Sequence, residues 1–306
     1  MAVATIADIM AKQYGSMLYL LAEQKGSKLQ NKVRREPITS AEEAYFDTIG
    51  SATAVKKTVR HGATNLVEAD FGRRKVAPDD YEIANPVDNE DKLKMIIDPT
   101  SAFALRQASA MGRAKDDAII AAATGTALIG KTGATSKTFQ ADSVSINGDG
   151  TVTTLGTLAA VTTIVDMTLA KILTMMKIFN EGDVDPDIPK HWIVTPKDIE
   201  DMLDITELTS ADYVTMKNLQ RGAVDTFAGF SFEWSNRLGV DAASSTGNRT
   251  LAWAEDGIIL GVAKDLQTRI DERPDISYTI QVYSSMSMGA VRMEGVKVHE
   301  CLNKIA

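Results

Sequence analysis

The stretch DPTSAFALRQASAMGRAKDDAIIAAAT, residues 98–124, indicates the fold more clearly than any other part of the chain. Asp98 suits the N-cap of a helix and Pro99 its first position. The residues that follow are rich in alanine and contain no further proline, so they predict a helix from Thr100 to Thr124. At 1.5 Å per residue, this helix would be about 38 Å long. A narrow stripe of mostly small side chains predicts close packing against a sheet: Phe103, Gln107, Met111, Ala114, Ala118, Ile119 and Ala122.

The segment before this helix, residues 52–97, predicts an extended ribbon. Val55–Arg60 and Arg73–Ile83 can form strands, and His61-Gly62 begins a turn-rich connection between them. The middle of the ribbon is polar on both faces, and an isolated two-stranded hairpin is marginally stable in water. We therefore expect the ribbon to lie against a neighbour.

The N-terminal part of the chain predicts a helix followed by a basic arm. Residues 5–23 have apolar side chains at helical spacing, whereas residues 24–35 are basic and lack an apolar pattern. Residues 1–75 hold twelve basic and eight acidic side chains, while the whole chain holds 33 and 41. Such a basic segment could lie on the acidic body of another copy. A solvated face without a partner explains the same charges.

The chain after residue 124 predicts a mixed region of helices and strands. Residues 125–157 are rich in Gly, Ser and Thr, which is typical of loops or of a weak hairpin at Thr138–Thr153. The later patterns predict a helix at Val165–Asn180, a buried strand at His191–Val194, a helix starting at Thr195, short strands within 226–238 and 249–271, and a final strand of about 14 residues with alternating apolar side chains from Tyr278 to Ala290.

Composition argues against several classes of protein. The single cysteine, Cys301, cannot form an intrachain disulfide, and no Cys/His cluster has the spacing of zinc ligands. No apolar run approaches the roughly 20 residues that a membrane helix needs. The net charge of −8 argues against a surface that binds nucleic acid all over. We therefore expect no metal, no other cofactor and no membrane partner.

One motif fits a nucleotide-binding site. Residues 125–132, GTALIGKT, match the P-loop pattern, in which the lysine (here Lys131) contacts the terminal phosphates. A P-loop follows a strand and opens a helix, but here the predicted helix comes first and residues 133–139 show no helical pattern. We interpret the motif as a loop that leaves the helix. A P-loop nucleotide hydrolase that uses Lys131 remains an alternative function.

Other groups of reactive side chains indicate no site. Asp183–Asp187 alternates acids as a calcium loop does, but Pro186 interrupts it and the required glycine and glutamate are missing. His299 and Cys301 share a face of a late strand and are interpreted as ordinary strand residues. The pair Asp116-Asp117 is interpreted as solvated or ion-paired carboxylates.

Several segments resemble tailed-phage coat proteins, both in their residues and in their order. They are DYEIA at 80–84 leading to IDPTS at 97–101, MGRAKDDAIIAA at 111–122, GFSFEWSNRL at 229–238 and YSSMSMGAVRME at 283–294. Over nearly its whole length, the chain resembles the major capsid proteins of tailed double-stranded DNA bacteriophages. The resemblance implies an α+β fold of the Hong Kong 97 type.

The resemblance also implies a division of the chain. It places an N-terminal arm at 1–36, the start of a peripheral domain at 37–49, an extended loop at 50–97, the peripheral domain with its spine helix at 98–154, an axial domain at 155–257, and a return to the peripheral domain at 258–306.

The implied function is structural rather than enzymatic. Copies would form pentamers and hexamers that build the icosahedral head, with scaffold, portal and decoration proteins as partners and double-stranded DNA enclosed without sequence-specific binding. The virion capsid would be the location, after assembly in the bacterial cytoplasm. An encapsulin-like compartment shell is the alternative with the same fold. The residues expected to pair with acids on a neighbouring copy are Arg60, His61, Arg73, Arg74 and Lys75 near the loop tip, together with Arg34 and Arg35.

Overall fold

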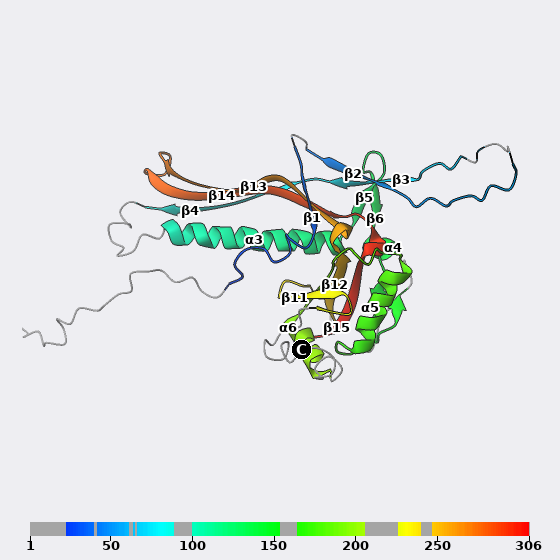
Figure 1. Cartoon of the computed structure of the whole chain (residues 1–306). Helices are drawn as coiled ribbons and strands as arrows, with labels where there is room; N and C mark the ends of the chain where they lie inside the picture. The colour runs from blue at the N-terminus through cyan, green and yellow to red at the C-terminus, as the bar shows by residue number, and fades with distance from the viewer. Residues whose placement is uncertain are drawn as a thin grey trace, which may run out of the picture. The chain divides into compact units, whose positions relative to one another are not determined.

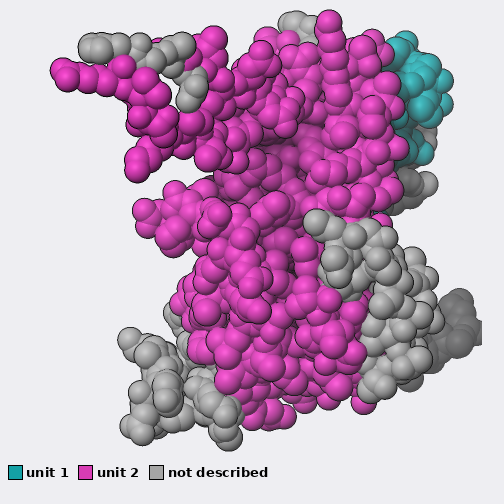
Figure 2. Space-filling model, turned by 90° about the vertical axis from the view of Figure 1, so that its right-hand side faces the viewer, with its two compact units in different colours: residues 1–26, 80–113, 266–286 teal, residues 27–79, 114–265, 287–306 magenta. Residues whose placement is uncertain are grey.

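The computed structural model describes residues 23–39, 42–60, 64, 66–88, 100–153, 164–205, 226–239 and 247–305. Nearly all of the predicted helix at 5–23 and the predicted cap Asp98-Pro99 lie outside these residues. The chain forms two compact units, coloured separately in Figure 2. Unit 1 comprises Met1–Gly26, Asp80–Arg113 and Leu266–Met286, and unit 2 comprises Ser27–Asp79, Ala114–Asp265 and Ser287–Ala306.

The long helix predicted from residues 98–124 is confirmed. Helix α3 runs from Thr100 to Thr124 (Figure 1). Within unit 1, the buried side chain of Gln107 donates from Nε2 to the carbonyl of Val282 in strand β14 (Thr279–Arg292) at 2.9 Å. Ser284 of the same strand donates back to Gln107 Oε1 at 2.7 Å. The buried apolar side chains of the helix are Met111, Ile119 and Ala123, and the polar side chains of Gln107, Ser109 and Asp116 are buried as well.

The first sheet contains the long strands of the chain. Its order is β1-β13-β14-β4, with β1 at Arg34–Pro37, β13 at Ile258–Arg273 and β4 at Asp79–Val87. Strand β14 has 14 residues, which confirms the predicted long last strand. The expectation of only short strands in 249–271 is wrong, because β13 has 16 residues. From Ala263 onward its side chains are exposed or half-buried, so its sequence has no apolar alternation that would reveal a strand.

The second sheet, with two helices, encloses the main apolar core of unit 2. The strand order is β10-β11-β9-β12-β15-β7-β8. Trp192 and Phe230 contact each other edge to face at 5.3 Å, and Phe179 of helix α5 (Leu169–Glu181) packs on Phe230 at 5.5 Å. Helix α6 (Pro196–Asp204) begins with a capping box between Thr195 and Asp198, which confirms the predicted start. The strands are β7 (Ser145–Ile146), β8 (Val152–Thr153), β9 (Lys190–Val194), β10 (Thr226–Phe227), β11 (Phe230–Trp234), β12 (Gly247–Ala254) and β15 (Val298–Lys304).

The third sheet forms the base of the loop that leaves unit 2. Its order is β2-β3-β5-β6, with β2 at Ala44–Ile49, β3 at Phe71–Val76, β5 at Ala127–Ile129 and β6 at Thr135–Lys137. The short helix α4 (Phe139–Asp142) follows β6, and the 3-10 turns η2 (Glu255–Gly257) and η3 (Gly295–Lys297) precede β13 and β15. Figure 1 shows the chain between β2 and β3 as a thin segment that extends away from the sheet.

The predicted partner of the second ribbon strand is wrong. Residues 55–60 form no strand, and β3 instead pairs antiparallel with β2, from Ile49 opposite Phe71 to Ala44 opposite Val76. The second predicted strand is divided, because β3 ends at Val76 and β4 starts at Asp79 in a different sheet. The predicted hairpin at Thr138–Thr153 is present only as the short pair β7–β8.

Candidate functional site

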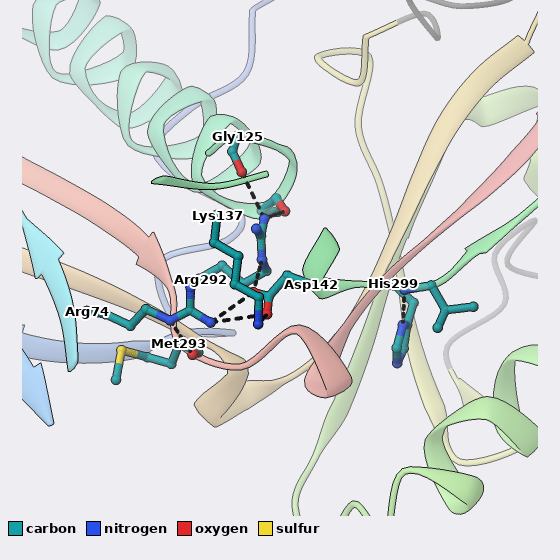
Figure 3. A network of polar contacts seen from close by, with 9 residues as sticks. Arg74, Gly125, Lys137, Asp142, Arg292, Met293 and His299 are labelled. Atoms are coloured by element: carbon teal, nitrogen blue, oxygen red, sulfur yellow. Dashed lines mark hydrogen bonds and ion pairs between the residues drawn. The ribbon is translucent and has the colours of Figure 1, made fainter. Parts of the chain in front are cut away.

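The carboxylate of Asp142 lies where three cationic side chains of unit 2 converge (Figure 3). Arg74 of β3 donates from Nη2 to Oδ1 and Oδ2 at 3.2 and 2.9 Å. Lys137 Nζ lies 2.6 Å from Oδ1, and Arg292 donates from Nε to Oδ2 at 3.0 Å. The side chains of Arg292, Asp142 and Arg74 are 0%, 4% and 10% exposed. Asp142 therefore joins the ends of β6 and β14 to the middle of β3.

The two arginines of this network also bind backbone carbonyls. Arg292 donates from Nη1 to the carbonyls of Ala123 and Gly125 at 2.8 and 3.0 Å, at the C-terminal end of α3. The last carbonyls of a helix have no partner within it and carry partial negative charge, so a cation stabilises them. Arg74 donates from Nε to the carbonyl of Met293 at 2.9 Å. The base of the loop is therefore tied to β14 and α4.

The charges of this network are not balanced. Burial alone would raise the pKa of Asp142, but hydrogen bonds from Lys137 and Arg292 and the charge of Arg74 outweigh it and hold that pKa below its ordinary value. Burial lowers the pKa of Arg292, against the opposing effect of Asp142. Among the described residues, Arg74 Nη1 and Arg292 Nη2 are buried without a hydrogen-bond partner. One carboxylate thus serves three cations, and two guanidinium groups retain unused donors.

The outward face of β2 and β3 carries ion pairs within the chain. Arg73 donates to both carboxylate oxygens of Asp47, at 2.5 and 2.9 Å, and these bonds hold the pKa of Asp47 below its ordinary value. Lys75 pairs with Glu43, which also accepts a hydrogen bond from Tyr45 at 2.9 Å. Arg73 and Lys75 are therefore already paired inside their own chain.

A cavity of about 870 Å³ lies beside this sheet within unit 2. Arg74 and Asp142 line it, together with the apolar side chains of Ile49, Phe71 and Val296. Ile49 and Phe71 face each other across the last pair of the β2–β3 ladder and are each 68% exposed. The cavity therefore combines a charged wall with an exposed apolar edge.

The loop beyond this pair has no core of its own. Every described residue from 50 to 60 and from 66 to 70 is exposed. The exposed residues include large apolar side chains: Val55 (58%), Val59 (62%), Leu66 (91%) and Val67 (55%). They also include the cations Lys56, Lys57 and Arg60.

The residues predicted at the loop tip do not lie together. Arg73, Arg74 and Lys75 belong to β3, which pairs with β2 and β5, so their placement at the tip is wrong. Arg74 is buried at 8% exposure, with its charge directed to Asp142. Arg60 is exposed on the loop, and His61 lies outside the described residues.

Arg34 and Arg35 occupy a separate position in β1, parallel to the start of β13. Arg34 pairs with Glu36 at 2.7 Å, and Arg35 lies 3.4 Å from Asp265. Both arginine side chains remain about half exposed, at 58% and 43%. Pairs of this kind contribute little to stability, so both arginines can still reach another molecule.

The P-loop motif lacks the structure that nucleotide binding requires. Residues 127–129 form strand β5, which pairs with β6 in an antiparallel hairpin. Helix α3 precedes the motif and ends at Thr124, and the next helix, α4, starts only at Phe139. The P-loop geometry, a strand followed by a loop and a helix, is therefore contradicted.

The other candidate side chains have structural surroundings. Asp116 is buried, not solvated: it accepts hydrogen bonds from Ser27 Oγ at 2.5 Å and from the backbone of Lys28 and Leu29 at 3.1 Å, which anchors the arm to α3. Asp117 pairs with Arg237. His299 and Cys301 are buried in β15. In the described ranges, no three or more His, Cys, Asp or Glu side chains are grouped to hold a metal.

Sequence reasoning missed Asp142 and the role of Arg292. Asp142 lies in a region read as loops, and the residues that meet there are separated by 68 and 150 positions along the chain. One signal was available: Arg292 has the same parity as the apolar residues of the last strand, which places a cation on its buried face.

The family of the chain follows from its sequence as a whole. A family model described as phage capsid protein matches residues 6–304. The chain belongs to the phage capsid protein family. It is a major capsid protein, a structural subunit of a bacteriophage shell. No curated protein sequence matches it significantly.

Solved structures agree with the capsid family in their fold. The capsid of cyanophage P-SCSP1u shares 14% identity with this phage capsid protein, over 100% of this chain and 96% of that chain, with a TM-score of 0.72. The cyanophage Pam1 capsid shares 14% over 99% and 98%, with a TM-score of 0.70. The capsid of Helicobacter pylori bacteriophage KHP30 shares 10% over 100% and 99%, also at 0.70.

These likenesses confirm the expected α+β fold of the Hong Kong 97 type. They do not favour the encapsulin-like shell or the nucleotide hydrolase as the function of this capsid protein. No described helix combines the length and the apolar character that crossing a membrane requires.

Proposed function

We propose that copies of this capsid protein form pentamers and hexamers that close an icosahedral head around the double-stranded DNA of a tailed phage. The family and the fold support a subunit that is repeated many times. The net charge of −8 supports a wall that encloses DNA without recognising its sequence. Scaffold, portal and decoration proteins are the proposed partners, and the bacterial cytoplasm is the proposed place of assembly. The role is structural, without catalysis.

The observation that carries this proposal is the coreless loop between β2 and β3. Four large apolar side chains on it are more than half exposed, and its described residues make no strand. Such a segment gains free energy only when another surface covers it, at about 25 cal/mol per Å² of apolar surface buried. A neighbouring copy supplies that surface in every subunit of a closed shell.

The residues that we propose for this contact differ from those first expected. Arg60, with Lys56 and Lys57, gives the loop an exposed positive charge that can meet acids on the next copy. His61 remains a proposal from the sequence alone. Arg34 and Arg35 are proposed for a second contact, through β1. Arg73 and Lys75 could contact another copy only by leaving Asp47 and Glu43. Arg74 contributes indirectly, because it holds the base of the loop through Asp142.

The division of the chain stays a proposal as well. We assign residues 50–97 to the extended loop, 155–257 to the axial domain around the five-fold and six-fold centres, and 1–36 to the arm. The peripheral domain would combine 37–49, 98–154 and 258–306. The sheet β2-β3-β5-β6, in which β3 lies between β2 from 37–49 and β5 from 98–154, supports the joining of these two segments.

The test compares the full chain with a variant in which residues 52–69 are replaced by a short Gly-Ser linker. Electron microscopy and size-exclusion chromatography should show closed shells from the full chain, and only free subunits or small rings from the variant. Thermal unfolding of the free subunits should be nearly the same for both, because the loop has no core. Closed shells at normal yield from the shortened chain would refute the role of the loop.

A further inference from the structure

We infer that the side chains of Lys171 and Asn303 join in an amide bond inside one folded chain, and that Asp198 carries the proton from one nitrogen to the other. The bond would link helix α5 to strand β15 covalently, and it would form once in each subunit without an added enzyme. The inference goes beyond the proposed function, because it concerns a single copy and does not depend on assembly.

The two side chains already touch in the interior of unit 2. Nζ of Lys171 lies 3.0 Å from Oδ1 of Asn303, and the two residues are 1% and 0% exposed. Sulfur atoms surround the amide, with Cys301 Sγ 3.6 Å from Oδ1 and Met167 Sδ 3.7 Å from Nδ2. The folded chain therefore holds the two groups together and excludes water from them, and both effects favour a reaction between them.

The amine of Lys171 has no carboxylate among its hydrogen-bond partners. Nζ lies 2.9 and 2.8 Å from the backbone carbonyls of Val165 and Leu302, and its third partner is Asn303. Burial lowers the pKa of Lys171, against smaller opposing effects that include the charge of Asp198. A neutral amine has only two N–H groups for these three acceptors, so its lone pair is left for the amide of Asn303.

The carboxyl group of Asp198 suits the transfer of a proton. It is 0% exposed, and burial raises its pKa, which favours the protonated acid. Oδ2 accepts hydrogen bonds from the backbone and the hydroxyl group of Thr195 at 2.8 and 2.6 Å. Oδ1 is buried without a hydrogen-bond partner among the described residues, which is rare for a polar atom in a native structure. Asn303 influences the pKa of Asp198, so the carboxyl group lies close to the amide.

The reaction balances without another reagent. The lone pair of Lys171 Nζ attacks Cγ of Asn303, and the new C–N bond gives a tetrahedral intermediate. The bond between Cγ and Nδ2 then breaks, and Nδ2 leaves as ammonia with a proton from Asp198. Asp198 takes a proton back from Nζ. One secondary amide and one ammonia molecule are formed, and nothing is oxidised or reduced.

The bond would have a mechanical consequence for the subunit. The two residues are 132 positions apart, so the amide would close a long covalent loop. A cross-link of this kind restricts the unfolded chain and stabilises the folded one. Helix α5 and strand β15 could then not separate even when a force pulls on the subunit.

The test is the mass of the full chain, purified folded and then unfolded in denaturant, followed by peptide mass spectrometry. Lys171→Met removes the attacking amine. Lys177→Met is the matched control, because Lys177 lies on the same helix with its side chain 70% exposed. Asp198→Asn removes the carboxyl group that transfers the proton.

We expect the original chain and Lys177→Met to lack the mass of one ammonia molecule and to give a branched peptide that joins residues 171 and 303. Lys171→Met should have its full mass, and Asp198→Asn should form the bond at least about 100-fold more slowly after refolding. A full mass for the folded original chain would overturn the inference, whether or not any variant folds. Loss of ammonia without the branched peptide would overturn it too. An unchanged rate in Asp198→Asn would refute the role given to Asp198.

Discussion

At the scale of single residues, Asp142 joins segments that are far apart in the chain. Its carboxylate is the shared partner of Arg74, Lys137 and Arg292, and two of these cations are almost inaccessible to water. Breaking a buried ion pair leaves a charge without compensation, which costs more than the pair itself contributes. Loss of the Asp142 carboxylate would therefore leave the buried charges of Arg74 and Arg292 without compensation.

We expect Asp142→Asn to lower the free energy of unfolding of the dissociated subunit by about 3–5 kcal/mol. An amide cannot neutralise Arg292, whose side chain is fully buried. Asp47→Asn is the matched control: its pair with Arg73 is exposed to solvent, so the expected loss is much smaller. Urea denaturation of both variants gives the comparison. Equal losses would show that the buried network does not stabilise the fold.

His299 should make stability depend on pH. Its ring packs edge to face on Phe179 at 4.8 Å and bonds to the backbone of Val144 and Val296. Burial lowers the pKa of His299 from 6.5 to about 4. Between these values the unfolded chain binds the proton and the folded chain does not, so stability falls as the pH drops from 6.5 to 4, by roughly 3 kcal/mol in all.

The measurement is the free energy of unfolding of dissociated subunits at pH 7 and pH 4.5. His299→Gln should be less stable than the original chain at pH 7 but should lose less stability on acidification. A pH dependence unchanged by this substitution would assign the effect to other groups.

At the scale of elements, the helices and strands that could be predicted from the sequence were those with a periodic pattern of apolar residues. Helix α3 and strand β14 follow regular apolar spacing, and both were found where the pattern placed them. Strand β13 was missed because its exposed half has no apolar face. Val55 and Val59 suggested that residues 55–60 form a strand and pair with β3. The strand that pairs with β3 is β2, because contacts between distant parts of the chain, and not local β-propensity, determine the pairing.

The candidate site was harder to predict than the fold, for a physical reason. Basic residues at 73–75 were visible in the sequence, but their alternation across β3 sends Arg73 and Lys75 outward and Arg74 inward. Which acid each one meets depends on segments far away in the chain. The sequence therefore identified the correct basic segment, residues 73–75, but assigned the wrong contacts to its side chains.

The close packing of η3 on α4 gives a prediction at this scale. A side chain at Gly295 would collide with the backbone carbonyl of Asp142, which cannot move without displacing the buried network. We expect Gly295→Ala to destabilise the subunit by about 1–3 kcal/mol. Gly239→Ala is the control, because nothing lies near its added methyl group. Thermal unfolding should separate the two, and similar midpoints would mean that η3 shifts freely.

At the scale of the whole molecule, the chain divides its charged residues between two uses. Cations at the base of the loop are bound by acids of the same chain, whereas those farther out, such as Lys57 and Arg60, are exposed. Contacts between copies in this region should therefore depend on salt mainly through the outer part of the loop. Contacts between copies at the base of the loop should instead depend on the burial of apolar surface.

The exposed loop should also determine how long a free subunit survives near a protease. Trypsin cleaves after lysine and arginine, and Lys56, Lys57 and Arg60 lie together on a segment without strand or helix. We expect brief digestion of free subunits to cut there first, and assembled shells to resist at the same sites. Equal cleavage in both states would mean that the loop stays uncovered.

In a cell, this difference in protease resistance would separate assembled from unassembled subunits. If a neighbouring copy covers the loop as proposed, assembled subunits would hide this segment, while surplus subunits would stay open to degradation. The loop would thus set the lifetime of the unassembled protein as well as its contacts.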